Sequence, residues 1–181
     1  MTDTASPFTH FVLPADVPPS GLRLHFGADA AAAAALATRA DALAVDGFRA
    51  EFEVKPWSGT GFLVTGRITA RLTQSCVVTL EPVETAVDET VDLKLVPPED
   101  MAKYELSPDE NGEVDLVALT DRPEPIEDGR IDLGALAVEH FLLGVDPYPR
   151  KPGAVFDADA AGVGNDPSTS PFAALARLGK E

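Results

Sequence analysis

The chain has 181 residues, of which 45% are hydrophobic and 24% charged, a composition typical of a globular protein and not of a disordered one. Acidic residues outnumber basic ones by 30 to 14, which gives a formal net charge of −16 and disfavours a broad surface for nucleic acid. The sequence lacks the apolar run of roughly 18 residues that a membrane span needs, and its start lacks the features of a signal peptide. With a single cysteine, no internal disulfide is expected. We therefore expect a cytoplasmic protein that binds neither a membrane nor DNA.

The excess negative charge is concentrated in one part of the sequence. Residues 81–128 hold 16 acidic and 3 basic residues, whereas the chain on either side is nearly neutral. Such a stretch is either a solvated, solubilising face or a patch that attracts a basic partner protein. In the second interpretation, the acidic residues expected to dock the partner are Asp109, Glu110, Glu113 and Asp115.

Alternating apolar and polar residues predict an antiparallel β-sheet with one face exposed to solvent, because the alternation has a period of two residues over four segments. The four segments are Leu22–Phe26, Phe48–Pro56, Phe62–Gln74 and Val83–Leu95. Their order favours a meander, either open or curved into a barrel. Cross-strand ion pairs are expected between Arg67 and Arg71 of the third segment and the acidic residues of the fourth. Those acidic residues are Glu84, Asp88 and Asp92.

Two helices are predicted, one before the long strands and one after the acidic stretch. The first is the alanine-rich run Ala30–Ala44, with Asp29 as its N-cap and Gly47 at its C-terminal end. The second is Ile131–Leu143, for which Asp132 is the expected N-cap. Its apolar residues fall on one face, so we expect it to pack on the sheet.

These elements predict a single α+β domain over residues 1–156, in which two helices cover the sheet. An acidic loop at about 97–129 belongs to this domain and contains a short strand candidate at Glu113–Leu119. Residues 157–170 have the composition of a flexible linker, and residues 171–181 are predicted to contain a short amphipathic helix.

No motif in the sequence indicates an enzyme, a metal site or a cofactor site. The histidines at positions 10, 25 and 140 are far apart, and Cys76 has no second cysteine near it, so a zinc site is not expected. Cys76 is either a small buried residue at a strand end or a nucleophile that the fold brings close to a histidine. Glu139 and His140 are about 100° apart around the second helix and do not converge on one substrate atom.

Two segments carry a family resemblance. Residues 72–82, LTQSCVVTLEP, are similar to a Cys-x-x-Cys-Leu-x-Pro region at a strand end. Residues 131–143, IDLGALAVEHFLL, with prolines at 147 and 149, are similar to a pattern of Asp-Leu-Gly, a helix carrying Glu, and a proline exit. Both patterns resemble those of the YceD family, the bacterial and plastid large ribosomal RNA subunit accumulation proteins. Thr79 stands where the family has its second cysteine, so no role of a cysteine pair is carried over.

The resemblance implies a non-enzymatic ribosome biogenesis factor that supports the accumulation of large-subunit ribosomal RNA. Its expected partner is ribosomal RNA or a basic ribosomal protein of the large subunit. The alternatives are an acidic chaperone or escort for a basic protein and, from another class, an enzyme that uses Cys76. No catalytic residues transfer from the family. The candidate interaction residues are Asp132, Glu139, Asp109, Glu110, Glu113 and Asp115.

Overall fold

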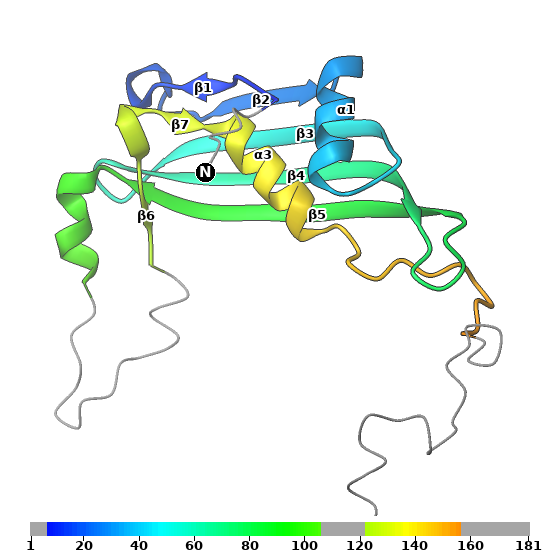
Figure 1. The fold of residues 1–181 in the computed structure, drawn as a ribbon. Coiled ribbons are helices and arrows are strands. Elements are labelled where there is room, and N and C mark those ends of the chain that lie inside the picture. Colours follow the sequence, from blue (N-terminus) through cyan, green and yellow to red (C-terminus); the bar gives the residue numbers. More distant parts are fainter. Residues whose placement is uncertain (1–6, 106–121, 157–181) are drawn as a thin grey trace, which may run out of the picture.

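A five-stranded sheet forms the frame of the protein, and α-helices lie on one of its faces (Figure 1). The structure is a computed structural model, and it describes residues 7–105 and 122–156. The strands are β1 (Phe11–Val12), β2 (Leu22–Gly27), β3 (Ala44–Trp57), β4 (Gly61–Ser75), β5 (Pro82–Val96), β6 (Glu124–Pro125) and β7 (Ile131–Asp132). The helices are α1 (Ala30–Arg39) and α3 (Leu133–Leu143), and short 3₁₀ turns are η1 (Pro14–Asp16), η2 (Pro98–Tyr104) and η3 (Glu127–Gly129).

The sheet has the strand order β2-β3-β4-β5-β6. Neighbouring strands from β2 to β5 are antiparallel and follow one another in the chain, which confirms the predicted meander. The short β6 adds to β5 in parallel, and β1 pairs with β7 in a separate two-stranded sheet. The five-stranded sheet is open, with β2 and β6 at its edges, and does not close into a barrel.

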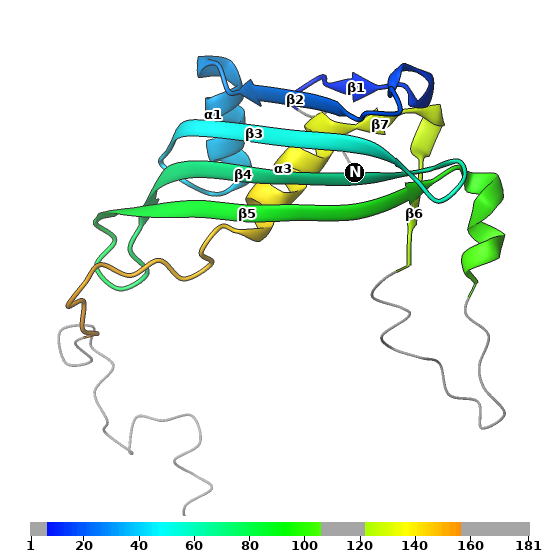
Figure 2. The same ribbon diagram turned by 180° about the vertical axis from the view of Figure 1, so that it is seen from behind.

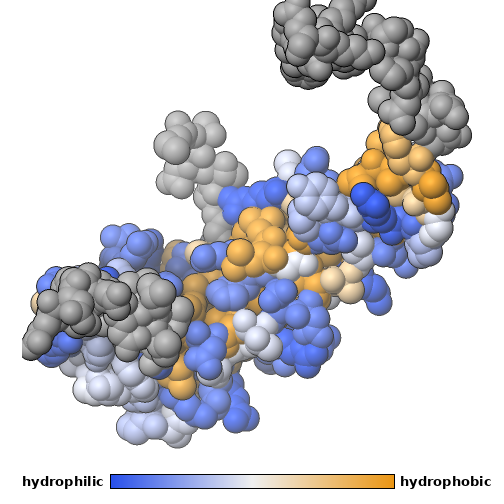
Figure 3. Space-filling model, turned by 90° about the horizontal axis from the view of Figure 1, so that it is seen from below, coloured by the Kyte–Doolittle hydropathy of each residue, from blue (hydrophilic) through white to orange (hydrophobic). Residues whose placement is uncertain are grey.

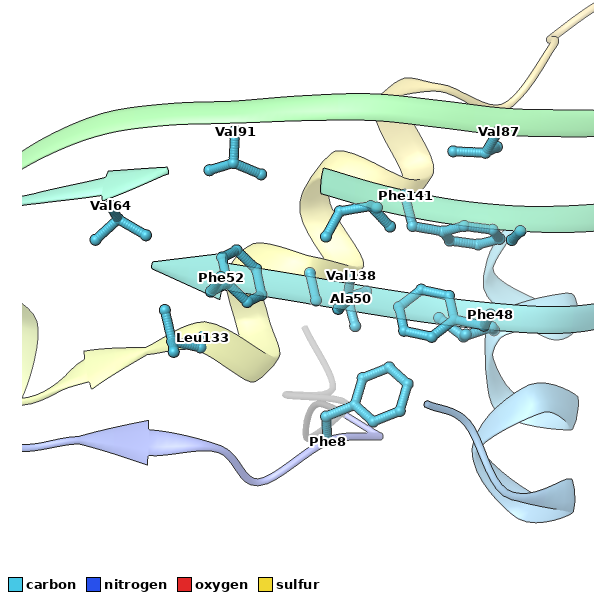
Figure 4. Packing of buried hydrophobic residues seen from close by; sticks show 14 of the residues in the cluster. Phe8, Phe48, Ala50, Phe52, Val64, Val87, Val91, Leu133, Val138 and Phe141 are labelled. Carbon is cyan, nitrogen blue, oxygen red and sulfur yellow. The ribbon is translucent and has the colours of Figure 1, made fainter. Parts of the chain in front are cut away.

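The two faces of the sheet differ as the alternating pattern predicts. The inner face packs against α1 and α3, and its side chains form the core between sheet and helices (Figure 4). Phe52 of β3, Val64 of β4 and Phe141 of α3 are at most 3% exposed. The opposite face, seen from behind, is not covered by any described element (Figure 2). It carries charged and polar side chains, among them Arg67, which forms the expected cross-strand pair with Asp88 at 2.5 Å.

The first helix is shorter than predicted. Asp29 caps it by accepting a hydrogen bond from the N–H of Ala32, but the helix ends at Arg39 and not at residue 44. The chain reverses at Asp41, where φ is 50°, and the N–H of Leu43 already donates to a carbonyl of β4. Gly47 is not a helix cap: it lies inside β3 with a φ of 61°, next to a shift in the strand register. Pairing with β4 therefore overrides the helix propensity of alanine in this segment.

The second helix begins where the sequence predicts its cap, since the side chain of Asp132 accepts a hydrogen bond from the N–H of Ala135 at 2.8 Å. Residues 131 and 132 themselves form β7. The N-terminal segment crosses the start of α3: the N–H of Leu133 donates to the carbonyl of His10, and a Cβ built on Gly134 would lie 2.6 Å from the carbonyl oxygen of Phe8. The glycine of the Asp-Leu-Gly sequence thus permits this close packing.

The acidic connection after β5 contains more structure than the predicted loop. It begins with η2 and ends with β6 and η3, which return the chain to the sheet before α3. The strand candidate at Glu113–Leu119, the predicted linker 157–170 and the predicted helix in residues 171–181 lie outside the described residues.

Candidate functional site

A cleft with an acidic rim opens between the β6–β7 connection and α3. The β6–β7 connection lies at the end of the sheet opposite α1 (Figure 1). Its volume is about 270 Å³. The apolar side chains that line it are Leu95, Pro125, Ile126, Ile131 and Leu136. Of these, Leu95, Ile126 and Ile131 are at most 6% exposed. The charged side chains that line it are Glu124, Glu127, Asp128, Arg130, Asp132 and Glu139. A buried apolar lining is therefore surrounded by carboxylates.

One basic residue, Arg130, belongs to the described lining of the cleft. Its guanidinium carbon lies 4.0 Å from the centroid of the Phe11 ring, a cation–π contact, and its Nη2 lies 3.8 Å from a carboxylate oxygen of Asp128. The backbone reaches this arrangement through positive φ angles of 49° at Asp128 and 68° at Gly129. Because one guanidinium faces five carboxylates, the cleft carries net negative charge.

Asp132 and Glu139 lie on the same side of α3. They are seven residues apart, which is about two helical turns, and both line the cleft. Asp132 is also the helix cap, whereas the exposed side chain of Glu139 makes no ion pair with another described residue. The adjacent His140 points elsewhere, since its Nδ1 lies 3.0 Å from the carbonyl oxygen of Leu136. Among the described residues, Glu139 thus has no contact that gives it a role in the fold.

The structure brings together two of the six residues that the sequence analysis singled out, Asp132 and Glu139. The other four, Asp109, Glu110, Glu113 and Asp115, lie outside the described residues. Three carboxylates of the cleft were not singled out, although they belong to the acidic stretch; these are Glu124, Glu127 and Asp128. The charge of the stretch was the available signal, but the pairing of β6 with β5 that places them beside α3 has no local sequence pattern.

Cys76 lies in a second region, where the loop between β4 and β5 meets the chain that follows α3. The thiol is fully buried directly after the end of β4. Two backbone hydrogen bonds tie the loop to this chain: the N–H of Lys151 donates to Cys76 Sγ at 3.3 Å, and the N–H of Val77 donates to the carbonyl of Pro149. The Lys151 ammonium also pairs with the carboxylate of Glu81 at 2.8 Å. These contacts fix the chain after α3 against the end of the sheet.

The environment of Cys76 favours its thiolate. The backbone N–H of Lys151, together with the hydroxyl and N–H of Thr79, lowers the pKa of the thiol from 9.0 to about 6. No histidine joins it, because His10 stacks on Phe26, His25 lies on β2 opposite Glu51, and His140 contacts its own helix. The described residues therefore do not form the Cys–His pair that a nucleophilic mechanism needs.

Within the described part of the chain, no group of three or more His, Cys, Asp or Glu residues is arranged to hold a metal ion. The same residues include no helix with the length and apolar content to cross a membrane.

Fold and cleft together define an α+β protein with a net negative cleft at one end of its sheet. A family model described as "Large ribosomal RNA subunit accumulation protein YceD" matches residues 64–179. The chain belongs to the YceD family, and the family description implies a role in the accumulation of large-subunit ribosomal RNA and names no reaction. The match begins in β4 and includes the whole cleft and the Cys76 loop. No curated protein and no solved structure matches the chain.

Proposed function

We propose that this protein is a non-enzymatic assembly factor for the large ribosomal subunit, and that it acts by binding a basic ribosomal protein at the acidic cleft. In this proposal it works in the cytoplasm and supports the accumulation of large-subunit ribosomal RNA through that protein contact.

The observation that carries the proposal is the arrangement of charge around the cleft. Five carboxylates and one guanidinium surround an apolar lining within the segment that matches the family. A lysine or arginine side chain fits such a site, because its apolar stem is buried while its charged head stays among carboxylates. The single guanidinium of Arg130 offsets at most one of these five carboxylate charges.

A direct contact between the cleft and ribosomal RNA is disfavoured, because phosphates would meet carboxylates and not the lysines and arginines that replace their counterions. The alternative of a stand-alone acidic chaperone has no support in the family match, which is to proteins described by ribosomal RNA accumulation.

The test uses a double variant of the cleft, Asp132→Asn with Glu139→Gln, in cells that lack the wild-type copy. Both changes remove charge but keep size, and asparagine remains a good helix cap. Tagged protein is purified with and without ribonuclease, and the bound proteins and the level of large-subunit ribosomal RNA are measured. We expect wild-type protein to retain a basic ribosomal protein after ribonuclease treatment. The variant should bind it severalfold more weakly and accumulate less large-subunit RNA.

The matched control is Asp41→Asn with Asp46→Asn, which removes two exposed carboxylates outside the cleft, one just after α1 and one near the start of β3. It should behave as wild type.

Binding through carboxylates also weakens as salt is added, because the Debye length falls from about 10 Å at 0.1 M to about 3 Å at 1 M. Loss of every protein partner on ribonuclease treatment would instead indicate a direct RNA contact. Equal binding by the cleft variant and the control, at any salt concentration, would refute the proposed site.

A further inference from the structure

The lower edge of β5 is not covered by another strand over most of its length (Figure 1). The opposite edge of β5 pairs with β4 without a shift of register from Pro82 to Leu95. On the free edge, β6 pairs with Leu95 and Val96 alone. Within residues 7–105 and 122–156, no strand therefore pairs with the edge from Pro82 to Lys94. Such an edge is a template for pairing with another extended chain.

The residues that face this edge can be identified from one hydrogen bond. The N–H of Ile126, next to β6, donates to the carbonyl of Val96 at 2.8 Å, so the backbone of Val96 points to the free edge. Because backbone direction alternates along a strand, every second residue before Val96 points the same way. These residues are Glu84, Ala86, Asp88, Thr90, Asp92 and Lys94.

The side chains of the same residues lie on the uncovered face of the sheet, because side chains alternate with the same period and Val87, Val91 and Leu95 are in the core. The free edge thus carries a carboxylate at every fourth residue, at positions 84, 88 and 92, which are about 13 Å apart. Seen from below, this side of the molecule shows hydrophilic residues interspersed with hydrophobic ones (Figure 3). Asp88 is paired with Arg67, whereas Glu84 and Asp92 make no ion pair with another described residue.

We propose that the free edge of β5 binds an extended, lysine- or arginine-rich segment of the partner protein as an added antiparallel strand. This inference rests on the proposed function, because it takes the partner to be a basic protein. In an antiparallel pair, residues directly opposite exchange hydrogen bonds and share a face, so basic side chains of the added strand lie across from Glu84, Asp88 and Asp92.

Other occupants fit the edge less well. Two copies of this chain that paired through β5 would place these carboxylates close to one another, and like charges opposite each other destabilise a sheet. The edge also leads directly to the acidic cleft, because Leu95 of β5 and Glu124 of β6 line it. A strand bound along the edge would therefore end at the cleft, where a further basic side chain meets carboxylates.

The probe is a synthetic peptide of alternating lysine and threonine, labelled for fluorescence anisotropy and added to the full chain. Two matched peptides differ in backbone methylation. One carries a methyl group on the backbone nitrogen of every lysine, and the other carries it on the backbone nitrogen of every threonine. A lysine that lies across from one of the carboxylates directs its backbone N–H group to β5. Methylation of the lysine backbone nitrogens therefore removes the hydrogen-bond donors that join the peptide to β5. Methylation of threonine removes N–H groups on the far side of the peptide and leaves these donors intact. All three peptides have the same charge.

We expect the unmodified and threonine-methylated peptides to bind with similar Kd, and the lysine-methylated peptide to bind at least about tenfold more weakly, because several hydrogen bonds are lost. Amide hydrogen exchange should show that the unmodified peptide protects the N–H groups of Ala86, Asp88, Thr90 and Asp92. The variant Thr90→Pro removes one N–H of the free edge and leaves the pairing with β4 intact, so it should weaken binding while Thr90→Val does not.

Equal Kd for the two methylated peptides, or no binding of any peptide, would overturn the inference, and the peptide comparison decides this even if Thr90→Pro fails to fold. Two further outcomes distinguish failure of this inference from failure of the proposed function. If the cleft variants weaken binding of the ribosomal protein but Thr90→Pro does not, the cleft is the site and the added strand is refuted. If peptides add to β5 but cells yield no basic ribosomal protein, the edge is real and the proposed partner is wrong.

Discussion

The backbone N–H of Lys151 donates a hydrogen bond to the sulfur of Cys76 at 3.3 Å, although the two residues are 75 positions apart in the chain. This bond connects the β4–β5 loop to the chain that follows α3. It is also the largest cause of the lowered pKa of the Cys76 thiol, because a hydrogen bond to the sulfur stabilises the thiolate more than the thiol. Folding and the ionisation of Cys76 are therefore linked.

Stability should rise with pH through this linkage. The pKa of the thiol is about 6 in the folded chain and 9.0 when unperturbed, so the unfolded state holds the proton over this range. The contribution is complete above pH 9.0, falls as pH decreases towards 6, and is absent below it. Thermal unfolding of wild type and Cys76→Ala between these pH values should show the rise in wild type alone. Parallel pH profiles would contradict the linkage.

The Lys151 backbone can be tested by a pair of substitutions. Lys151→Pro removes the N–H and should raise the pKa of the thiol, followed by thiolate absorbance in the ultraviolet. Lys151→Ala keeps the N–H and removes the ion pair with Glu81, so it should leave the pKa close to 6. An equal shift in both variants would assign the effect to the lysine charge.

Gln74 is the buried polar side chain among the described residues, and it fixes the same chain after α3. Its Nε2 donates to the carbonyl of Asp146 at 3.0 Å, and its Oε1 accepts from the hydroxyl of Thr85 at 2.6 Å. Gln74→Leu removes both bonds and should lower the free energy of unfolding by about 1–3 kcal/mol, measured with urea. Thr73→Val, on the uncovered face, is the control and should change it by less than about 0.5 kcal/mol.

Gly134 provides a test in which the usual helix rule is reversed. Alanine normally stabilises a helix relative to glycine by about 1 kcal/mol. Here the new Cβ would lie 2.6 Å from the carbonyl oxygen of Phe8, so Gly134→Ala should destabilise the fold by about 1–3 kcal/mol in chemical unfolding. Glu139→Ala, on the exposed side of the same helix, is the comparison and should be nearly neutral. A gain in stability for Gly134→Ala would show that the N-terminal segment does not pack as described.

The parts of the fold that the sequence predicts are those with a local physical cause. The strands follow from the alternation of apolar and polar residues, since Val87 and Val91 face the core while Asp88 faces solvent. The two helix caps follow from the ability of a short carboxylate to accept the N–H groups of the first turn, as Asp29 and Asp132 do.

The parts that the sequence does not predict depend on residues far apart in the chain. Helix α1 ends early because Leu43 donates to Thr73 of β4, a partner 30 residues away. The cleft needs the parallel addition of β6 to β5, which brings Glu124 beside Leu95 and Glu139. A single acidic stretch signals negative charge, but it carries no information on which carboxylates converge.

Asp132 has two roles that substitutions can separate. Its side chain caps α3 by accepting the N–H of Ala135, and its charge contributes to the acidic cleft. Asp132→Ala removes both and should lower the free energy of unfolding by about 0.5–2 kcal/mol, whereas Asp132→Asn keeps the cap and should cost far less. Because Glu139 is exposed and makes no ion pair with another described residue, Glu139→Gln should leave stability within about 0.5 kcal/mol of wild type. Urea unfolding followed by circular dichroism measures all three. If Glu139→Gln instead destabilises the protein strongly, Glu139 supports the structure. A lower RNA level in cells that carry this variant would then say nothing about partner binding. If Asp132→Asn keeps stability but weakens binding of the basic partner, the charge of Asp132 acts in the cleft and not through the helix.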